Sequence, residues 1–363
     1  MTRHEGHAMS EASDQLARRY RRLLWAYPRA YRRERGAEMI DTLLAAAMPG
    51  RRRPAARERV NLLRHGLRGR LGRPRSKAIV VIAGLAAVLG GFLGAAGAAR
   101  ASWQGARPLP GNAASATIAQ AVLPTAASTK WSRHDDLFFY DDPTDAWTPL
   151  FGADDYSPGW VRAGMQSRED HRALIPSIEG RLRDAGWQVT DLRFNEADTW
   201  AGARFSAYRD GLALDIILSD ATNAVPVLPG MATILEVDIM RDDPWWVVPA
   251  SVVGGLLGAL AGWLLAGWVS RRTQGRHAVL QTGVVLLTSA AFVGMLPAFG
   301  MTVLGVALSV MQPTPGPSSL VLWFGLVFLG RLPAVLGVVA ALAAIGLAAL
   351  PRRLQPGTGP AKA

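Results

Sequence analysis

The stretch AIVVIAGLAAVLGGFLGAAGAA, residues 78–99, contains no charged residue over 22 positions. At a rise of about 1.5 Å per residue, a helix of this length crosses the roughly 30 Å hydrocarbon core of a bilayer. We therefore expect 78–99 to be the first membrane span (TM1). Because 77 residues precede it, a retained signal anchor fits better than a cleaved signal peptide, and cleavage near Ala99 or Ala101 is the alternative.

Three more apolar runs follow towards the C-terminus, at residues 245–270 (TM2), 277–311 (TM3) and 319–350 (TM4). Tryptophans open the first of them, and Arg271 and Arg272 follow it, which is typical of a helix that leaves the membrane on the cytoplasmic side. The last two runs are long and interrupted by Pro297 and Pro333, so each is predicted to be one kinked or extended span. A re-entrant hairpin over residues 298–330 is the alternative.

Charge is distributed along the chain in blocks. The 363 residues include 37 Arg, 3 Lys and 28 acidic residues, and the net charge is +12. Residues 1–77 contribute +13, residues 100–245 contribute −8, and the remainder carries seven basic and no acidic residues. By the positive-inside rule, both termini are predicted to be cytoplasmic and residues 100–244 to lie outside. The preference for Arg over Lys favours a bacterial source, and therefore the bacterial inner membrane.

Residues 1–77 are predicted to form a small, basic, cytoplasmic helical head. Leu16, Tyr20 and Leu24 fall at helical spacing, Pro28 restarts the chain, and a second apolar stripe begins at Tyr31. Two short antiparallel helices are the simplest result. Such a pair is too small to be stable alone, so it packs against residues 55–71, against the membrane face or against a partner.

The sequence LWAYPRAYR (24–32), followed by GAEM (36–39), resembles a signature that opens many bacterial membrane proteins. Those proteins carry an N-terminal HAAS-type, or permease-prefix, helical domain and are frequently linked to PadR-type regulators; the resemblance covers residues 16–47. It implies a cytoplasmic interaction module and brings no catalytic residue. The expected partner contacts are Tyr27, Pro28, Tyr31, Glu38 and Met39. The large paired permease halves that usually follow are missing, which argues against transport.

The arginine clusters at residues 18–22, 51–53 and 64–77 allow three interpretations. Contact with anionic lipid at the inner leaflet is favoured, because each basic residue there gains about 1 kcal/mol. An acidic partner protein is the second. Nucleic acid is disfavoured, because no helix-turn-helix or other recognised motif accompanies the charge.

Between the first two spans, residues 100–130 are predicted to be a linker with one short helix, and residues 131–244 an extracytoplasmic α+β domain. A capping box at 167–170, an apolar stripe and Gly186 indicate one helix. Alternating patterns then predict strands near 187–194, 204–209, 212–218 and 233–240, with a turn at Asp210-Gly211. We expect this helix to cover one face of a three- or four-stranded antiparallel sheet. The core candidates are Trp187, Phe194, Phe205 and Leu214.

Nothing in this domain predicts catalysis. A dense group of carboxylates fits a solvated loop better than a Ca²⁺ site; it comprises Asp135, Asp136, Asp141, Asp142, Asp145, Asp154 and Asp155. His134 and His171 have no G-x-S-x-G context that would support a triad. With no Cys, the chain has neither disulfides nor thiol metal ligands. We expect no enzyme activity, no cofactor, no metal site and no catalytic residue.

The predicted spans contain small-residue ridges and few polar groups. Gly254, Gly258 and Gly262 share one face of the second span, which predicts close helix packing, within the chain or in a homo-oligomer. Arg331 is the one ionisable residue in the last apolar run, and the favoured place for it is the outer interface, with a polar cavity as the alternative.

The sequence as a whole predicts an α-helical polytopic membrane protein of four spans, with residues 351–363 as a cytoplasmic tail. The predicted role is regulatory or signalling: the outside domain senses or binds a ligand, and the head contacts a cytoplasmic regulatory protein. The alternative is a non-catalytic accessory subunit of a transporter or envelope-assembly complex, docked on another membrane protein.

Overall fold

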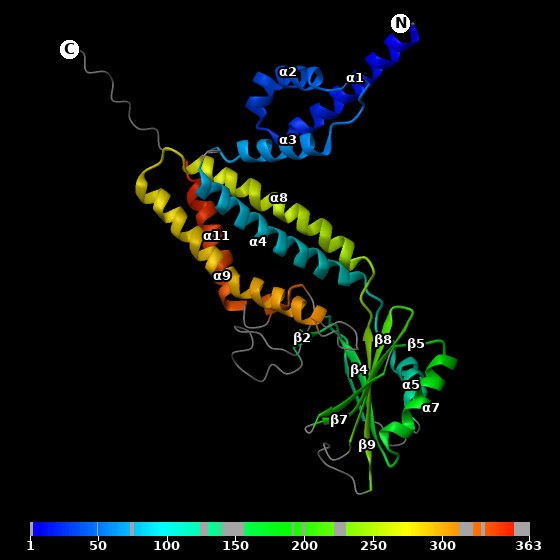
Figure 1. Cartoon of the computed structure of the whole chain (residues 1–363). Coiled ribbons are helices and arrows are strands. Elements are labelled where there is room, and N and C mark those ends of the chain that lie inside the picture. Colours follow the sequence, from blue (N-terminus) through cyan, green and yellow to red (C-terminus); the bar gives the residue numbers. More distant parts are fainter. Residues whose placement is uncertain are drawn as a thin grey trace, which may run out of the picture. The chain divides into compact units, whose positions relative to one another are not determined.

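The structure is a computed structural model of the whole chain (Figure 1). It describes residues 3–48, 50–72, 76–123, 130–137, 139–140, 156–190, 192–197, 200–220, 230–311, 322–327 and 331–351. The chain forms two compact units: one combines residues 1–91, 258–292 and 339–363, and the other combines residues 92–257 and 293–338. Segments of the long apolar helices occur in both.

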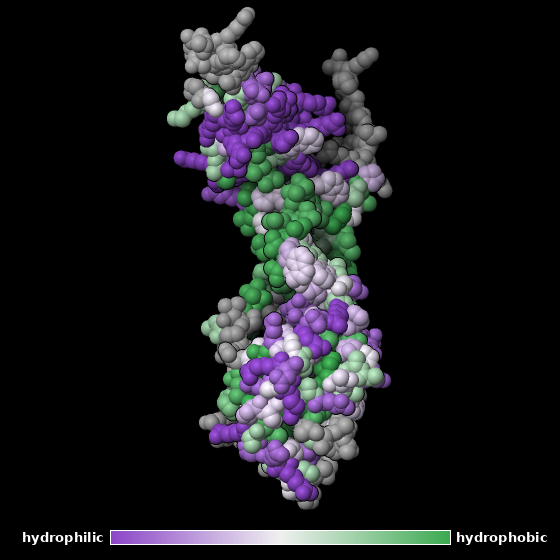
Figure 2. All heavy atoms as spheres, turned by 90° about the vertical axis from the view of Figure 1, so that its right-hand side faces the viewer, coloured by the Kyte–Doolittle hydropathy of each residue, from purple (hydrophilic) through white to green (hydrophobic). Residues whose placement is uncertain are grey.

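The head contains three helices and one 3₁₀ turn: α1 (Arg3–Leu23), η1 (Leu24–Ala26), α2 (Arg29–Ala45) and α3 (Ala56–Gly69). Pro28 caps α2, as the sequence predicts. α1 and η1 pack against α3, and α2 packs on α1 and η1, so residues 55–71 complete the core. The buried members of this core are Leu16, Tyr20, Leu24, Tyr27, Ile40 and Leu62. Hydrophilic side chains gather on the surface over these helices, whereas hydrophobic side chains cover the long apolar helices (Figure 2).

Among the described residues, four helices are long and apolar enough to span a membrane: α4 (Lys77–Ser102), α8 (Val247–Thr273), α9 (Ala278–Met311) and α11 (Arg331–Ala349). Many of their large apolar side chains are exposed, as expected where lipid is the solvent. α9 is continuous through Pro297. Within the predicted span 319–350, α11 covers the last part and a separate short helix, α10 (Phe324–Val327), precedes it. Arg331 is the first residue of α11.

The domain between α4 and α8 is built on a seven-stranded antiparallel sheet, ordered β1-β4-β9-β8-β7-β5 with β6 also paired to β7. Its strands are β1 (Lys130–His134), β4 (Trp160–Ser167), β5 (Gln188–Val189), β6 (Arg193–Ala197), β7 (Trp200–Arg209), β8 (Leu212–Asp220) and β9 (Thr233–Arg241). A small second sheet pairs β2 (Phe139–Tyr140) with β3 (Tyr156–Ser157). The prediction of three or four strands was therefore wrong: β1 and β4 were missed, and the expected strand at 187–194 divides into two.

The turn between β7 and β8 was predicted correctly. Asp210 and Gly211 both have positive φ, 51° and 74°, which is the geometry of a two-residue type I′ turn. Arg209 pairs with Leu212 directly beside it.

Two helices, α5 (Asn112–Val122) and α7 (His171–Asp184), cover the same face of this sheet (Figure 1). The α7 N-cap is Asp170, whose carboxylate accepts a 2.8 Å hydrogen bond from the backbone N–H of Arg172, and Gly186 follows the helix with φ 80°. A short 3₁₀ turn, η2 (Trp103–Gly105), joins α4 to the segment before α5. The expected linker at residues 100–130 thus contributes α5 to the core.

Three of the four predicted core residues are confirmed. Trp187, Phe205 and Leu214 are buried between the sheet and the helices. Phe194 is 51% exposed, so its prediction was wrong. It lies in β6, which pairs only with β7, and the guanidinium of Arg172 lies 5.8 Å from its ring centroid. At this edge the alternating pattern does not fix which face is buried.

Candidate functional site

The head is organised around the turn between α1 and α2. Arg70, just after α3, donates hydrogen bonds to the backbone oxygens of Trp25 (2.6 Å) and Ala26 (2.7 Å). Gly66 lies so close that an added Cβ would meet Ala26 and Tyr27 at less than 3 Å. The LWAYP motif therefore makes a tertiary contact, because Arg70 donates to backbone oxygens that the end of a helix leaves without a partner.

The five residues expected to contact a partner occupy different environments. Tyr27 is buried and stacks on Tyr31, with 5.5 Å between ring centroids and 15° between ring planes. Met39 packs against the head core, Pro28 is half-buried at the start of α2, and Glu38 is exposed. Tyr31 is 41% exposed. The surface that remains for a partner contains Tyr31 and Glu38, while Tyr27 and Met39 hold the head together.

The sequence analysis did not select Trp25, which is the most exposed aromatic residue of the described head, at 65%. Its ring lies 4.5 Å from the guanidinium carbon of Arg32, a cation–π arrangement that holds the indole against α2. An aromatic residue held at the surface in this way is typical of a protein-binding surface. We call Trp25, Tyr31 and Glu38 the aromatic surface.

The head is attached to the end of α8. The indole N–H of Trp263 donates a 3.0 Å hydrogen bond to the backbone oxygen of Leu67, in α3. A Cβ added at Gly267 would lie 3.0 Å from the backbone oxygen of Arg70, and Leu71 is fully buried. Arg70 therefore lies between two contacts, because it bonds the LWAYP turn on one side and its backbone abuts α8 on the other.

The glycine ridge of α8 packs against α4. A Cβ added at Gly254 would collide with the backbone oxygen of Gly94, and one added at Gly262 would collide with that of Ala86. The backbone of Gly258 is equally close to Gly90. The predicted packing role is thus seen within the chain, where Gly allows two backbones to approach each other.

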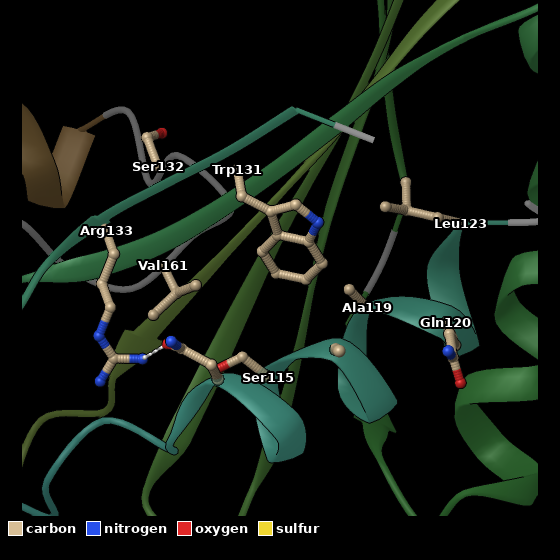
Figure 3. Close-up of a pocket in the computed structure, with 10 residues that line it drawn as sticks. Ser115, Ala119, Gln120, Leu123, Trp131, Ser132, Arg133 and Val161 are labelled. Atoms are coloured by element: carbon tan, nitrogen blue, oxygen red, sulfur yellow. Dashed lines mark hydrogen bonds between the residues drawn. The ribbon is translucent and has the colours of Figure 1, made fainter. Parts of the chain in front are cut away.

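A cavity of about 460 Å³ lies between α5 and the edge strand β1. The Trp131 indole projects from β1 towards α5, and Ser115 and Ala119 face it from the helix (Figure 3). Arg133 lies at one side, where it donates to the backbone oxygen of Pro110 (2.8 Å) and to Asn112 (3.2 Å). The mixture of an aromatic wall and a few fixed polar groups is typical of a small-molecule site.

The sheet face away from the helices carries a row of four charges across four strands, the Arg–Asp row, made of Arg162, Asp238, Asp215 and Arg204. Arg162 donates to both carboxylate oxygens of Asp238, at 2.6 and 2.7 Å, and Arg204 donates to Asp215 at 2.9 Å. The two aspartates lie opposite each other in the β8–β9 register. Burial raises the pKa of Asp215, which the Arg204 guanidinium opposes.

The candidate cation and triad residues do not form a site among the residues that the structure describes. Asp135 pairs with Arg133 at 2.7 Å, and its pKa is lowered by that hydrogen bond. His134 packs on Trp160 with 4.7 Å between ring centroids, and His171 Nδ1 lies 3.4 Å from Asp220. Within the described ranges no three His, Asp or Glu side chains gather as metal ligands. Asp136 also lies within the described ranges, and the remaining five aspartates of the acidic group lie outside them.

Comparison with known proteins gives no match: no family model, no curated protein and no solved structure is similar to this chain.

Proposed function

We propose that the chain is a multi-pass regulatory protein of the bacterial inner membrane, with both termini cytoplasmic. In this proposal the sheet domain binds a ligand outside the membrane, and the head contacts a cytoplasmic partner protein. The orientation is supported by the charge blocks, +13 over residues 1–77 and −8 over residues 100–245.

The observation that carries the proposal is the double connection of α8. The helix begins at Val247, soon after the inner strand β9 ends at Arg241. In its second half, Trp263 contacts α3 of the head, and Gly267 lies against Arg70 just after α3. A rigid helix connected in this way can carry coupling between two domains. Ligand binding that shifts or rotates α8 would therefore act directly on α3.

The cavity beside Trp131 is the candidate ligand site. It is large enough for a small molecule, and α5, which forms one wall, also contributes Ala119 and Val122 to the sheet core. A ligand that moves α5 would therefore disturb the packing of the sheet. The aromatic surface of Trp25, Tyr31 and Glu38 is the candidate partner site in the head.

The test is affinity purification of the tagged full-length protein in a mild detergent, followed by mass spectrometry. The variant Trp25→Ala/Tyr31→Ala removes two exposed aromatic rings. The control is Val60→Ala, which truncates a 61%-exposed apolar side chain of α3. We expect a stoichiometric cytoplasmic protein to be lost from the aromatic variant and retained by the control. Retention by both variants would overturn the proposed contact.

The alternative function is an accessory subunit of a transporter or envelope-assembly complex. Its predicted docking features were the glycine ridge of α8 and Arg331, but α4 occupies the ridge within the chain. None of α4, α8, α9 and α11 contains Asp, Glu or His, so these helices lack the groups of a proton relay. A transport complex that co-purifies with the protein even when residues 1–77 are deleted would favour the alternative. That the chain is not an enzyme stays a prediction.

A further inference from the structure

A second cavity, of about 290 Å³, lies within the head and is lined mainly by arginine. Four guanidinium-bearing side chains come from α1, from α3 and from the segment just before α3. They are joined by one leucine and one proline, and the complete lining is Arg19, Arg22, Leu23, Arg53, Pro54 and Arg59. We call this the arginine cavity.

The packing of α1 on α3 fixes the arginine cavity. The Tyr20 hydroxyl, fully buried, donates a 2.9 Å hydrogen bond to Glu58, which also accepts 2.9 Å from the backbone N–H of Ala55. This anchor lies beside two cavity residues, because Tyr20 follows Arg19 and Glu58 precedes Arg59. The arginines therefore converge on a rigid frame.

The guanidinium groups of the four cavity arginines make no hydrogen bond or ion pair with any residue that the structure describes. The nearest carboxylate in sequence, Glu58, is occupied by Tyr20, Ala55 and Arg51. Arg22, Arg53 and Arg59 are exposed to solvent and Arg19 is partly exposed, so water screens their mutual repulsion and leaves the guanidinium groups accessible to a ligand. A bound anion would remove the repulsion.

We propose that the arginine cavity binds a phosphate group. The guanidinium is a planar fork that matches phosphate oxygens with two parallel hydrogen bonds, and arginine is the preferred residue for such recognition. The volume is just below that of pockets for drug-sized ligands, which suits one charged head group. Leu23 and Pro54 supply an apolar wall for the uncharged part of the same molecule.

Two sources offer this chemistry, the head group of an anionic lipid and a soluble phosphorylated compound. Arg59 lies eight residues before Leu67, which contacts Trp263 of α8, and at about 1.5 Å per residue this is roughly 12 Å along α3. The cavity is thus roughly 12 Å along α3 from a residue that contacts α8, a helix long and apolar enough to span a membrane. The inference goes beyond the proposed function, because it needs no protein partner.

The test uses purified full-length protein and two probes. Inorganic pyrophosphate is titrated by calorimetry, and retention of phosphatidic acid, compared with phosphatidylcholine, is measured by native mass spectrometry. The cavity variant is Arg22→Gln/Arg53→Gln. The matched control, Arg33→Gln/Arg35→Gln, removes the same charge from equally exposed positions of α2 that do not line the cavity. The double variant Arg22→Lys/Arg53→Lys keeps the charge but removes the two planar guanidinium groups. It replaces the Gln pair as the test variant if the Gln pair does not fold.

We expect the cavity variant to bind at least tenfold more weakly than the wild type, and the control less than twofold more weakly. The Lys pair should bind severalfold more weakly. Retention of phosphatidic acid without pyrophosphate binding identifies a lipid, and pyrophosphate binding identifies a soluble compound; both support the site. The proposal is overturned if cavity and control pairs weaken binding equally, or if the wild type binds neither probe.

Discussion

In the sheet domain, Arg162 and Arg204 each hold a buried aspartate, whereas in the head Arg19, Arg22, Arg53 and Arg59 face one cavity and hold none. The carboxylates of the Arg–Asp row are 9% and 4% exposed, so the arginines compensate charge that the fold has buried. The cavity arginines compensate nothing within the described chain. Arginine thus stabilises the fold in the sheet domain and is available to bind a ligand in the head.

The largest effect should come from breaking the Arg–Asp row. Arg204→Ala leaves the Asp215 carboxylate buried and unpaired, and removing one partner of a buried pair costs about 3 kcal/mol or more. Thermal or denaturant unfolding of the detergent-solubilised protein measures the loss. Arg168→Ala, at an exposed position, is the control and should change stability by less than about 0.5 kcal/mol. Equal losses would show that the row is not a stabilising element.

A smaller loss is expected for Arg70→Ala in the head. It removes charged donors from the backbone oxygens of Trp25 and Ala26; because the bond to Trp25 is exposed and water can replace it, we expect a total loss of about 1.5–3 kcal/mol. Hydrogen exchange of the head amides should show faster exchange in the turn at residues 24–27. Unchanged protection there would mean that α3 is held by its apolar contacts alone.

The charge state of Glu58 should give the head a pH dependence. Hydrogen bonds from the Ala55 N–H and the Tyr20 hydroxyl lower the pKa of Glu58, while burial and this carboxylate raise the pKa of Tyr20 to about 12. A lowered pKa means that the folded head binds the proton less readily than the unfolded chain. Its stabilisation is therefore present above the ordinary value of 4.5 and is lost as the pH falls below it.

Unfolding of the head between about pH 7 and pH 3 measures this loss, given the ordinary pKa of a carboxylate. Glu58→Gln should lower the stability at neutral pH and flatten the dependence. A variant with the same pH profile as the wild type would assign the effect to other carboxylates.

The smallest effect on stability should come from the arginine cavity. Arg53→Gln removes one of several like charges, so without an anion the free energy of unfolding should stay within about 0.5 kcal/mol of the wild type, or rise. Added pyrophosphate should raise the melting temperature of the wild type more than that of the variant. A clear loss of stability in the absence of an anion would show that Arg53 stabilises the fold, as the paired arginines of the sheet do, and would contradict a ligand-binding role.

The membrane helices and the head could be predicted from the sequence because their signals are local. TM1 is an uncharged run that can be recognised without any tertiary contact. Leu16, Tyr20 and Leu24, which the helical spacing places on one face, are all buried in the head core. In the sheet domain, the turn at Asp210-Gly211 has a local signature too. Elements of this kind are specified by neighbours in the chain.

The remaining features depend on distant neighbours. β4 alternates weakly, because Ala163 and Gly164 are poor strand formers, and β1 is a polar edge strand with an exposed Trp131. The arginine cavity brings together residues more than 30 positions apart, through the bond between Tyr20 and Glu58. No sequence pattern around Tyr20 or around Glu58 predicts that the two residues are in contact.

Arg70 has a further consequence for how the protein is made. The head is complete only once residue 70 has been synthesised, because the turn between α1 and α2 takes its hydrogen-bond donors from Arg70. α4 begins at Lys77, so the last residue the head needs emerges from the ribosome ahead of the first membrane helix. Chains fold from the N-terminus as they are synthesised. This order of synthesis is compatible with the cytoplasmic location that we propose for the head.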